Sequence, residues 1–170
     1  VLIVAADVSP PGLDPQKSAA AHSWMIAEHV YSTLLRRDPK MNIVGDLAES
    51  WPVVSDTTFV FKLRKGVVWH HGRDLVADDV KYSFERVLDP KKKSPQYGNI
   101  RAIKEVTVVD AETVRLVTDK PFPLLLERLN IFTDPQRPMT VTQGIYEINN
   151  PDENSPVLVT TNFALTYFIV

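Results

Sequence analysis

Hydrophobic and polar residues alternate in the middle of the chain, and the pattern then becomes helical. Residues 59–63 read Phe-Val-Phe-Lys-Leu, which is typical of a strand with one buried face. Gly66 and Gly72 predict turns on either side of a short second strand. From residue 77 onward the apolar side chains share one helical face, formed by Ala77, Val80, Phe84, Val87 and Leu88. This stretch therefore predicts strand, turn, short strand, turn and helix.

Similar alternation predicts two β-hairpins. Their paired strands are expected at residues 52–55 with 58–63, and at residues 103–109 with 113–118. Asp56 and Thr57 would form the turn of the first hairpin. A helix is expected over residues 121–129, because proline is tolerated in the first helical turn. The polar, proline-punctuated residues 89–98 are expected to form a loop.

The first part of the chain predicts a strand and a second amphipathic helix. Residues 1–6 form a continuous apolar run, which indicates a buried strand. The helix is indicated by apolar residues three and four positions apart, namely Trp24, Ala27, Tyr31 and Leu34. Pro39 disfavours helical geometry at the residue before it, so we expect this helix to end near Arg37.

The amino-acid composition and net charge of the chain exclude several classes of function. The 170 residues are 44% hydrophobic and 24% charged, as in ordinary globular proteins. A net charge of -2 gives no indication of a nucleic-acid partner. The chain has no cysteine, which excludes disulfides, thiolate chemistry and cysteine-ligated metals. No apolar run approaches the length of a membrane-spanning segment, so we expect a soluble chain.

The residue types that carry out catalysis or bind metals do not form a recognisable set. Four histidines are present, but the adjacent pair His70 and His71 would point to opposite faces of a strand and make a poor chelate. Asp78 and Asp79 are explained by the positive end of the helix that follows them. No zinc-protease, phosphate-loop or nucleophile-elbow motif is present. We therefore predict no enzymatic activity, no metal site and no cofactor.

Residues at several fixed spacings resemble the family 5 solute-binding proteins, the extracytoplasmic receptors of peptide, dipeptide and nickel ABC importers. The resemblance rests on Leu13-Asp14-Pro15, Asp46-Leu47-Ala48, Ser50-Trp51, Leu63-Arg64, Trp69-His70-His71-Gly72, Ala77-Asp78-Asp79-Val80 and Tyr82-Ser83-Phe84. Two residues depart from the family pattern. His71 stands where the family usually has Asp, and Val76 stands where a Thr normally caps the helix. Loss of that cap should cost about 1 kcal/mol of stability.

This resemblance implies a fold and a function. The fold class would be α/β (α+β mixed), with a partial lobe of a periplasmic binding protein built from a mixed sheet, hairpins and flanking helices. The chain would be the substrate-binding component, or a fragment of it, of an ABC importer. It would capture a peptide or another small solute in a cleft between two lobes and deliver it to the permease. Its location would be periplasmic or extracytoplasmic.

The resemblance also indicates where the solute would bind. In the family, the segment after Leu-Asp-Pro lies at the cleft between the lobes and contributes ligand contacts. The candidate substrate-binding residues are therefore Ser18, His22 and Trp24. The alternative interpretation is that Trp24 packs in the core and that His22 caps the start of the helix or lies in solvent there.

The end of the chain resembles a different family. From about residue 132 the sequence is similar to the large subunit of the corrinoid iron-sulfur protein, a methyl carrier of the acetyl-CoA pathway. The similar segments are Pro138-Met-Thr140, Gly144-Ile-Tyr-Glu147, Asn150-Pro-Asp-Glu-Asn-Ser-Pro156 and Val159-Thr-Thr-Asn-Phe163. We therefore expect residues 1–130 to be the N-terminal part of a family 5 lobe, and residues 131–170 to be an unrelated β-rich tail or truncated segment. The alternative function is a fragment of that methyl carrier, although no cysteines are available for its iron-sulfur cluster.

Overall fold

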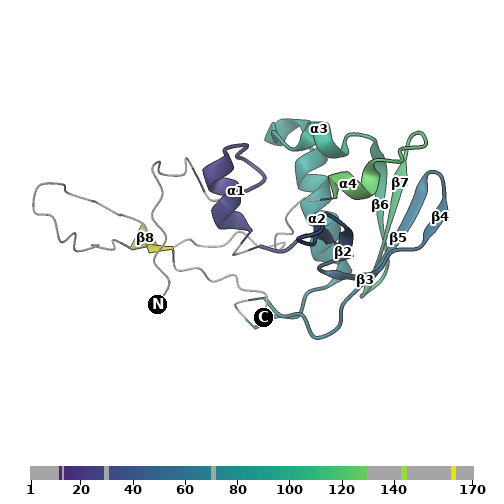
Figure 1. The fold of residues 1–170 in the computed structure, drawn as a ribbon, viewed down its shortest axis with the longest axis horizontal. Coiled ribbons are helices and arrows are strands. Elements are labelled where there is room, and N and C mark those ends of the chain that lie inside the picture. Colours follow the sequence, from purple (N-terminus) through teal and green to yellow (C-terminus); the bar gives the residue numbers. More distant parts are fainter. Residues whose placement is uncertain are drawn as a thin grey trace, which may run out of the picture.

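The computed structural model describes residue 12, residues 14–28, 31–69 and 72–129, and two short strands near the C-terminus. The elements, labelled in Figure 1, are α1 (Ala21–Ala27), β1 (Leu35–Arg37), β2 (Ile43–Gly45), β3 (Ala48–Ser50), β4 (Val53–Ser55), β5 (Thr58–Leu63), α2 (Ala77–Leu88), the 3₁₀ turn η1 (Pro90–Lys92), α3 (Tyr97–Ile100), β6 (Ile103–Asp110), β7 (Thr113–Thr118), α4 (Leu125–Arg128), β8 (Gln143–Gly144) and β9 (Asn162–Phe163). The predicted mixture of sheets and flanking helices is confirmed.

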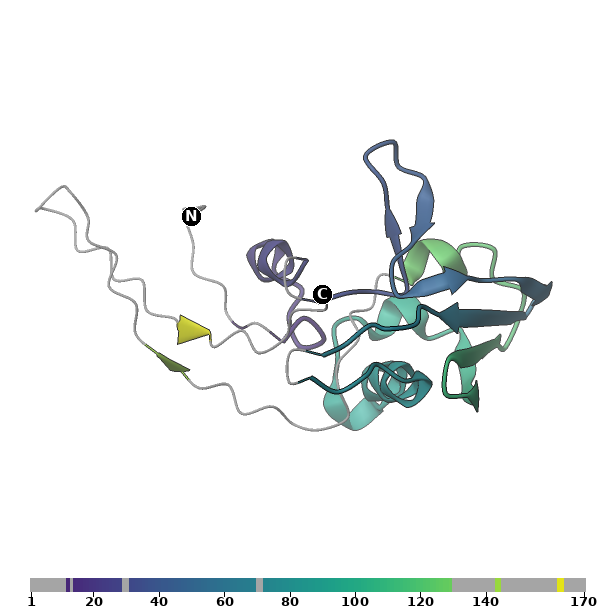
Figure 2. The same ribbon diagram turned by 90° about the horizontal axis from the view of Figure 1, so that it is seen from below.

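The main sheet has five antiparallel strands. Its order is β3-β5-β7-β6, and β4 also pairs with β5. In the β5–β7 pair, Phe59 lies opposite Leu116 and Phe61 lies opposite Val114. The long helix α2 packs against β6 and β7 (Figure 1, Figure 2). Both hairpins predicted from the alternating pattern are therefore present, as β4–β5 and β6–β7.

The core lies between α2 and one face of this sheet. Alternate residues of β5 are buried, and so are alternate residues of β7. The face of α2 predicted to be apolar is buried at Ala77, Val80, Phe84 and Val87. Burial of each large apolar side chain contributes about 1.5–3 kcal/mol. The opposite face of the sheet is more exposed and carries ion pairs of Lys62 with Glu49 and of Arg115 with Glu105, both at 3.4 Å.

A buried carboxylate organises the start of α2. Asp79 is fully buried and accepts hydrogen bonds from the indole Nε1 of Trp69 at 3.0 Å and from Nη2 of Arg73 at 2.7 Å. It also accepts from the backbone N–H of Val76 at 3.2 Å. Val76 itself provides no side-chain cap. Asp79 therefore joins the preceding loop to the first turn of the helix, a structural role beyond the helix-dipole effect expected from the sequence.

The short strand predicted between the two glycines is reduced to a single bridge. Val68 pairs with Asp74 in isolation, and the N–H of Gly72 bonds to the carbonyl of Trp69 at 2.7 Å. Gly66 and Gly72 have φ angles of 73° and 82°, a region that other residues rarely adopt. The two turns are as predicted, and the segment that begins between them makes further backbone bonds, from the N–H of Trp69 to the carbonyl of Arg73 at 2.8 Å and from the N–H of Leu75 to the carbonyl of Val67 at 2.9 Å.

The helix predicted to continue to Arg37 is much shorter, which corrects the sequence-based expectation. Helix α1 ends at Ala27, and residues 35–37 form β1, paired with β2. The backbone carbonyl of Leu34 accepts bonds from the N–H groups of Asp46 and Ala48, both at 3.1 Å. These long-range backbone bonds replace the helical ones, so tertiary pairing overrides the local helical spacing.

Two further predictions are corrected. The helix expected over residues 121–129 is limited to α4, because Pro123 disfavours helical geometry at Phe122. The loop expected over residues 89–98 contains η1 and the beginning of α3. The predicted strand at residues 1–6 lies outside the described residues, as do His29, His70, His71 and all of residues 131–170 except β8 and β9.

Candidate functional site

The segment that follows the Leu-Asp-Pro motif is attached to the core by α2. Arg86 of α2 donates to both carboxylate oxygens of Asp14, at 3.2 Å to Oδ1, and to Oε1 of Gln16 at 2.8 Å. Ser94 donates its hydroxyl to the carbonyl of Gln16 at 2.6 Å. Gln16 is only 3% exposed. These bonds fix the chain immediately before the candidate residues.

Ser18 uses its polar atoms to position α1. Its Oγ accepts from the N–H of Ala20 at 3.2 Å and donates to Oγ of Ser23 at 3.1 Å. Its carbonyl accepts from the indole Nε1 of Trp24 at 3.1 Å and from Nε2 of Gln96 at 3.3 Å. Ser18 is therefore the point at which the start of α1, Trp24 and the loop before α3 meet.

A cavity of about 490 Å³ opens beside Trp24. It lies between α1, the segment that contains β1, strand β2 and helix α4. Its lining residues are Trp24, Glu28, Tyr31, Ser32, Thr33, Leu35, Arg36, Arg37, Ile43, Asp46, Leu126 and Glu127. Two aromatic rings and charges of both signs thus surround one hollow, a combination suited to a small ligand with apolar and ionised groups.

Some of the charged groups in the cavity wall are held by the protein itself. Oδ2 of Asp46 accepts from the N–H of Thr33 at 2.9 Å, which fixes the chain where it leaves the region of α1. Arg37 pairs with Glu127 of α4 and links two walls of the cavity. Arg36, by contrast, is exposed and makes no ion pair with any residue in the described ranges. Its guanidinium is available to an anionic ligand group.

The structure separates the three predicted site residues. Trp24 lines the cavity, whereas Ser18 and His22 do not. His22 is partly exposed on α1. The sequence does not identify Tyr31 and Arg36 as cavity residues, because its local pattern predicts a helix there, and it indicates Asp46 only as part of a family motif. The β-branched and aromatic character of residues 30–33 was the available signal for an extended segment there.

The described residues contain no constellation for metal binding, since no group of three His, Asp or Glu side chains converges among them. None of the described helices is long and apolar enough to cross a bilayer. What the arrangement offers chemically is a partly enclosed, polar and aromatic surface for binding.

Comparison with known proteins gives two different kinds of similarity. The sequence profile of the bacterial extracellular solute-binding proteins, family 5 Middle, matches residues 42–162. The Periplasmic murein peptide-binding protein MppA of Escherichia coli is 30% identical over 131 residues, which cover 67% of this chain and 24% of that protein. A shorter match, 58% identical over 48 residues, is to the Acetyl-CoA decarbonylase/synthase complex subunit gamma of Methanopyrus kandleri and covers 28% of this chain and 10% of that subunit.

The fold agrees with the first kind of similarity. The crystal structure of NikZ from Campylobacter jejuni in complex with Ni(L-His) superposes with a TM-score of 0.70 at 33% sequence identity, covering 76% of this chain and 26% of that one. The chain thus spans about a quarter of the length of these two binding proteins. Because the profile match covers most of the sequence, the chain belongs to the bacterial extracellular solute-binding proteins, family 5.

Proposed function

We propose that this chain supplies one wall of the solute-binding cleft of an ABC-importer receptor, and that the solute is a peptide. The observation that carries the proposal is the cavity beside Trp24, placed on a fold of family 5. An aromatic wall suits peptide side chains, and Arg36 offers a counter-charge to a peptide carboxylate. The name of the MppA relative, a murein peptide-binding protein, supports a peptide over other solutes.

The chain binds its solute and does not transform it. Two lobes around a hinge close on the ligand, and the permease responds to the closed state because the ligand shifts the population toward it. We place the receptor in the periplasm or at the outer cell surface. This placement is supported by its MppA relative, which is named as a periplasmic protein. Its partners are the small solute and the permease of the importer.

Because a cleft between two lobes holds its ligand from both sides, the wall described here should bind peptide weakly. Calorimetry of the chain with a mixed pool of dipeptides and tripeptides tests this expectation. We expect no saturable heat at micromolar peptide, because one wall contributes only part of the binding free energy. Micromolar affinity would contradict the need for a second lobe.

A second candidate function rests on the match to subunit gamma, which is short but more than half identical. On this hypothesis the chain would be part of a corrinoid-dependent methyl carrier, and residues 131–170 would be a segment unrelated to the solute-binding lobe. An absorbance spectrum after incubation with a cobamide and gel filtration separates the two hypotheses, since a bound cobamide is coloured and a peptide is not. Retained colour would favour the carrier, whereas a colourless protein would favour the receptor.

A further inference from the structure

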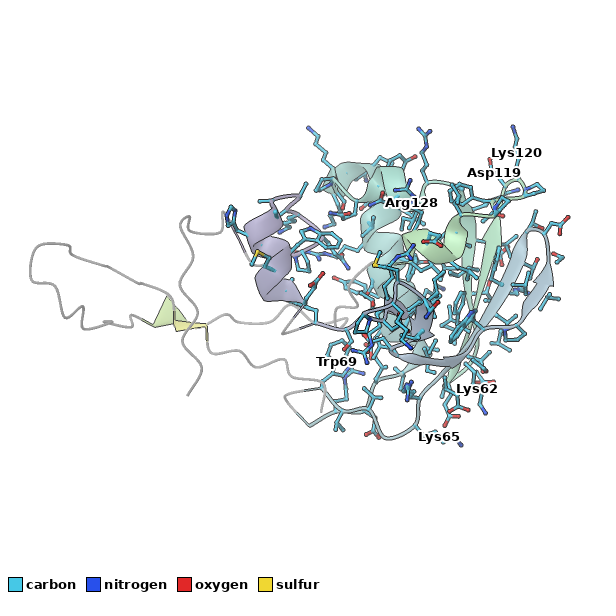
Figure 3. The ribbon with its side chains drawn as sticks, viewed as in Figure 1. Lys62, Lys65, Trp69, Asp119, Lys120 and Arg128 are labelled. Atoms are coloured by element: carbon cyan, nitrogen blue, oxygen red, sulfur yellow. The ribbon has the colours of Figure 1, made fainter. Side chains whose placement is uncertain are left out.

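A second hollow lies away from the cavity beside Trp24. It encloses about 550 Å³ between α3, the end of β7 and the segment that leads into α4. Three of its lining residues are cationic, Arg101, Lys120 and Arg128, and one is acidic, Asp119. We call this hollow the basic groove. Figure 3 shows Asp119, Lys120 and Arg128 at one end of the molecule, with Lys62 and Lys65 at the opposite end.

What distinguishes the cations of the basic groove is that three of them gather around one hollow without an ion pair to any carboxylate of the described residues. Within the described ranges, Arg101, Lys120 and Arg128 take part in no ion pair. In the described part of the chain, the one side-chain hydrogen bond that they make is from Nη1 of Arg128 to Oδ1 of Asn99, at 3.4 Å. At the opposite end, Lys62 pairs with Glu49 and Lys65 pairs with Glu112, each at 3.4 Å. With three cations and the single carboxylate of Asp119 in its lining, the basic groove keeps an excess of positive charge.

The groove also presents apolar surface. Leu124 is 54% exposed, and Phe122 is half-buried against the core. Both side chains lie among the same lining residues as the three cations. An exposed leucine that shares a groove with three cations is suited to a partner that combines carboxylates with an apolar side chain, because each feature matches one part of the groove.

We propose that the basic groove is a docking site for an acidic segment of a partner protein, in which carboxylates flank an apolar residue. The carboxylates meet Arg101, Lys120 and Arg128, and the apolar side chain covers Leu124. A protruding peptide segment fits the concave shape better than the flat surface of a bilayer does. This site is separate from the solute cavity, since the two hollows share no lining residue.

The test uses a short fluorescein-labelled peptide, rich in glutamate with a central leucine, and measures its anisotropy with the whole chain. We expect saturable binding that weakens as salt rises, because the attraction between exposed charges is screened. The double variant R101Q/K120Q should bind about tenfold or more weakly, equivalent to a loss of about 1.4 kcal/mol. The matched control K62Q/K65Q removes the same charge at the opposite end and should bind as the unchanged chain does.

The apolar part of the site has its own variant. L124S should weaken binding of the leucine-containing peptide but leave unchanged the binding of a peptide in which serine replaces leucine. Equal weakening by R101Q/K120Q and K62Q/K65Q would overturn the proposal, because it would indicate non-specific attraction. Lack of peptide binding, or binding only to vesicles of phosphatidylglycerol with the same sensitivity to R101Q/K120Q, would also overturn it. Circular dichroism of each variant checks that it is folded.

Discussion

Arg86 of α2 donates hydrogen bonds to the carboxylate of Asp14, which lies 72 residues earlier in the chain. The side chain of Arg86 is 15% exposed and that of Asp14 is 30% exposed, so water only partly screens the pair. The bond connects the best-formed helix of the core to the segment that leads into Ser18 and α1. The position of Trp24 therefore depends on a contact distant in sequence.

Replacement of Asp14 by Asn should reveal this dependence. D14N removes the charge but keeps the shape, and we expect a loss of about 1–2 kcal/mol in the free energy of unfolding. The control E85Q disturbs only the exposed pair of Glu85 with Lys81 at 3.8 Å on the same helix, and should cost less than about 0.5 kcal/mol. Urea unfolding followed by circular dichroism measures both. Equal stabilities of the two variants would show that the Asp14 contact does not hold the segment.

Asp79 should be the most sensitive polar residue of the core. D79N presents an amide to three hydrogen-bond donors that now meet a carboxylate, so we expect a loss of about 3 kcal/mol. W69F removes one donor to the carboxylate and should cost about 1.5–3 kcal/mol, the range for a hydrogen bond to a charged group. In the double variant the losses should not add, because the two residues share one contact. Additive losses in a double-mutant cycle would show that the two side chains act independently.

Val76 leaves the N-terminus of α2 without a side-chain cap. V76T should raise the free energy of unfolding by about 1 kcal/mol, because the threonine hydroxyl can accept from the N–H of Asp78, the second residue of the helix. The backbone at this position is already extended, with φ of -129° and ψ of 160°, as a cap requires. V76A has no such oxygen and serves as the control, which should not be stabilised. A threonine variant no more stable than the alanine variant would argue against a missing cap.

The turn of the β1–β2 hairpin should be sensitive to acid. Hydrogen bonds from the side chain and then the backbone of Asn42 hold the pKa of Asp38 below its usual value of 3.8. Because the folded-state pKa is the lower one, the contribution to stability is present above pH 3.8 and is lost as the pH falls through the lowered pKa.

The Asp38 interpretation can be checked by NMR titration of its carboxyl carbon. We expect a midpoint below 3.8 in the unchanged chain, and a shift toward 3.8 in N42A, where the largest cause of the lowered pKa is removed. A midpoint that N42A leaves unchanged would mean that the side-chain bond does not set the pKa.

The sequence predicts those parts of the fold in which local pattern and tertiary packing agree. Strands β5 and β7 alternate in the sequence and bury alternate residues in the structure. Helix α2 buries the face that its spacing indicates. Where local pattern and tertiary packing conflict, the long-range contact determines the structure. Leu34 continues the helical spacing that begins at Trp24, but its carbonyl accepts from the N–H groups of Asp46 and Ala48.

The candidate site was predictable only in part, for the same reason. Trp24, which belongs to the segment that the family resemblance indicates, lines the cavity, and Ser18 and His22 of the same segment do not. Sequence spacing could not indicate that the polar atoms of Ser18 face the protein, since that depends on Trp24 and Gln96, the latter 78 residues away. Sequence spacing also could not indicate that Leu126 and Glu127 line the same cavity as Trp24, because their approach depends on how the whole lobe packs.

The central claim is that Trp24 lies in the wall that contacts the solute. The most direct measurement follows the indole N–H signals of the three tryptophans by NMR while a dipeptide and tripeptide pool is added to millimolar concentration. The account predicts that the Trp24 signal shifts progressively and that the signal of Trp69, which is buried against Asp79, does not. A Trp24 signal that stays fixed while signals elsewhere in the chain respond to the peptides would contradict it.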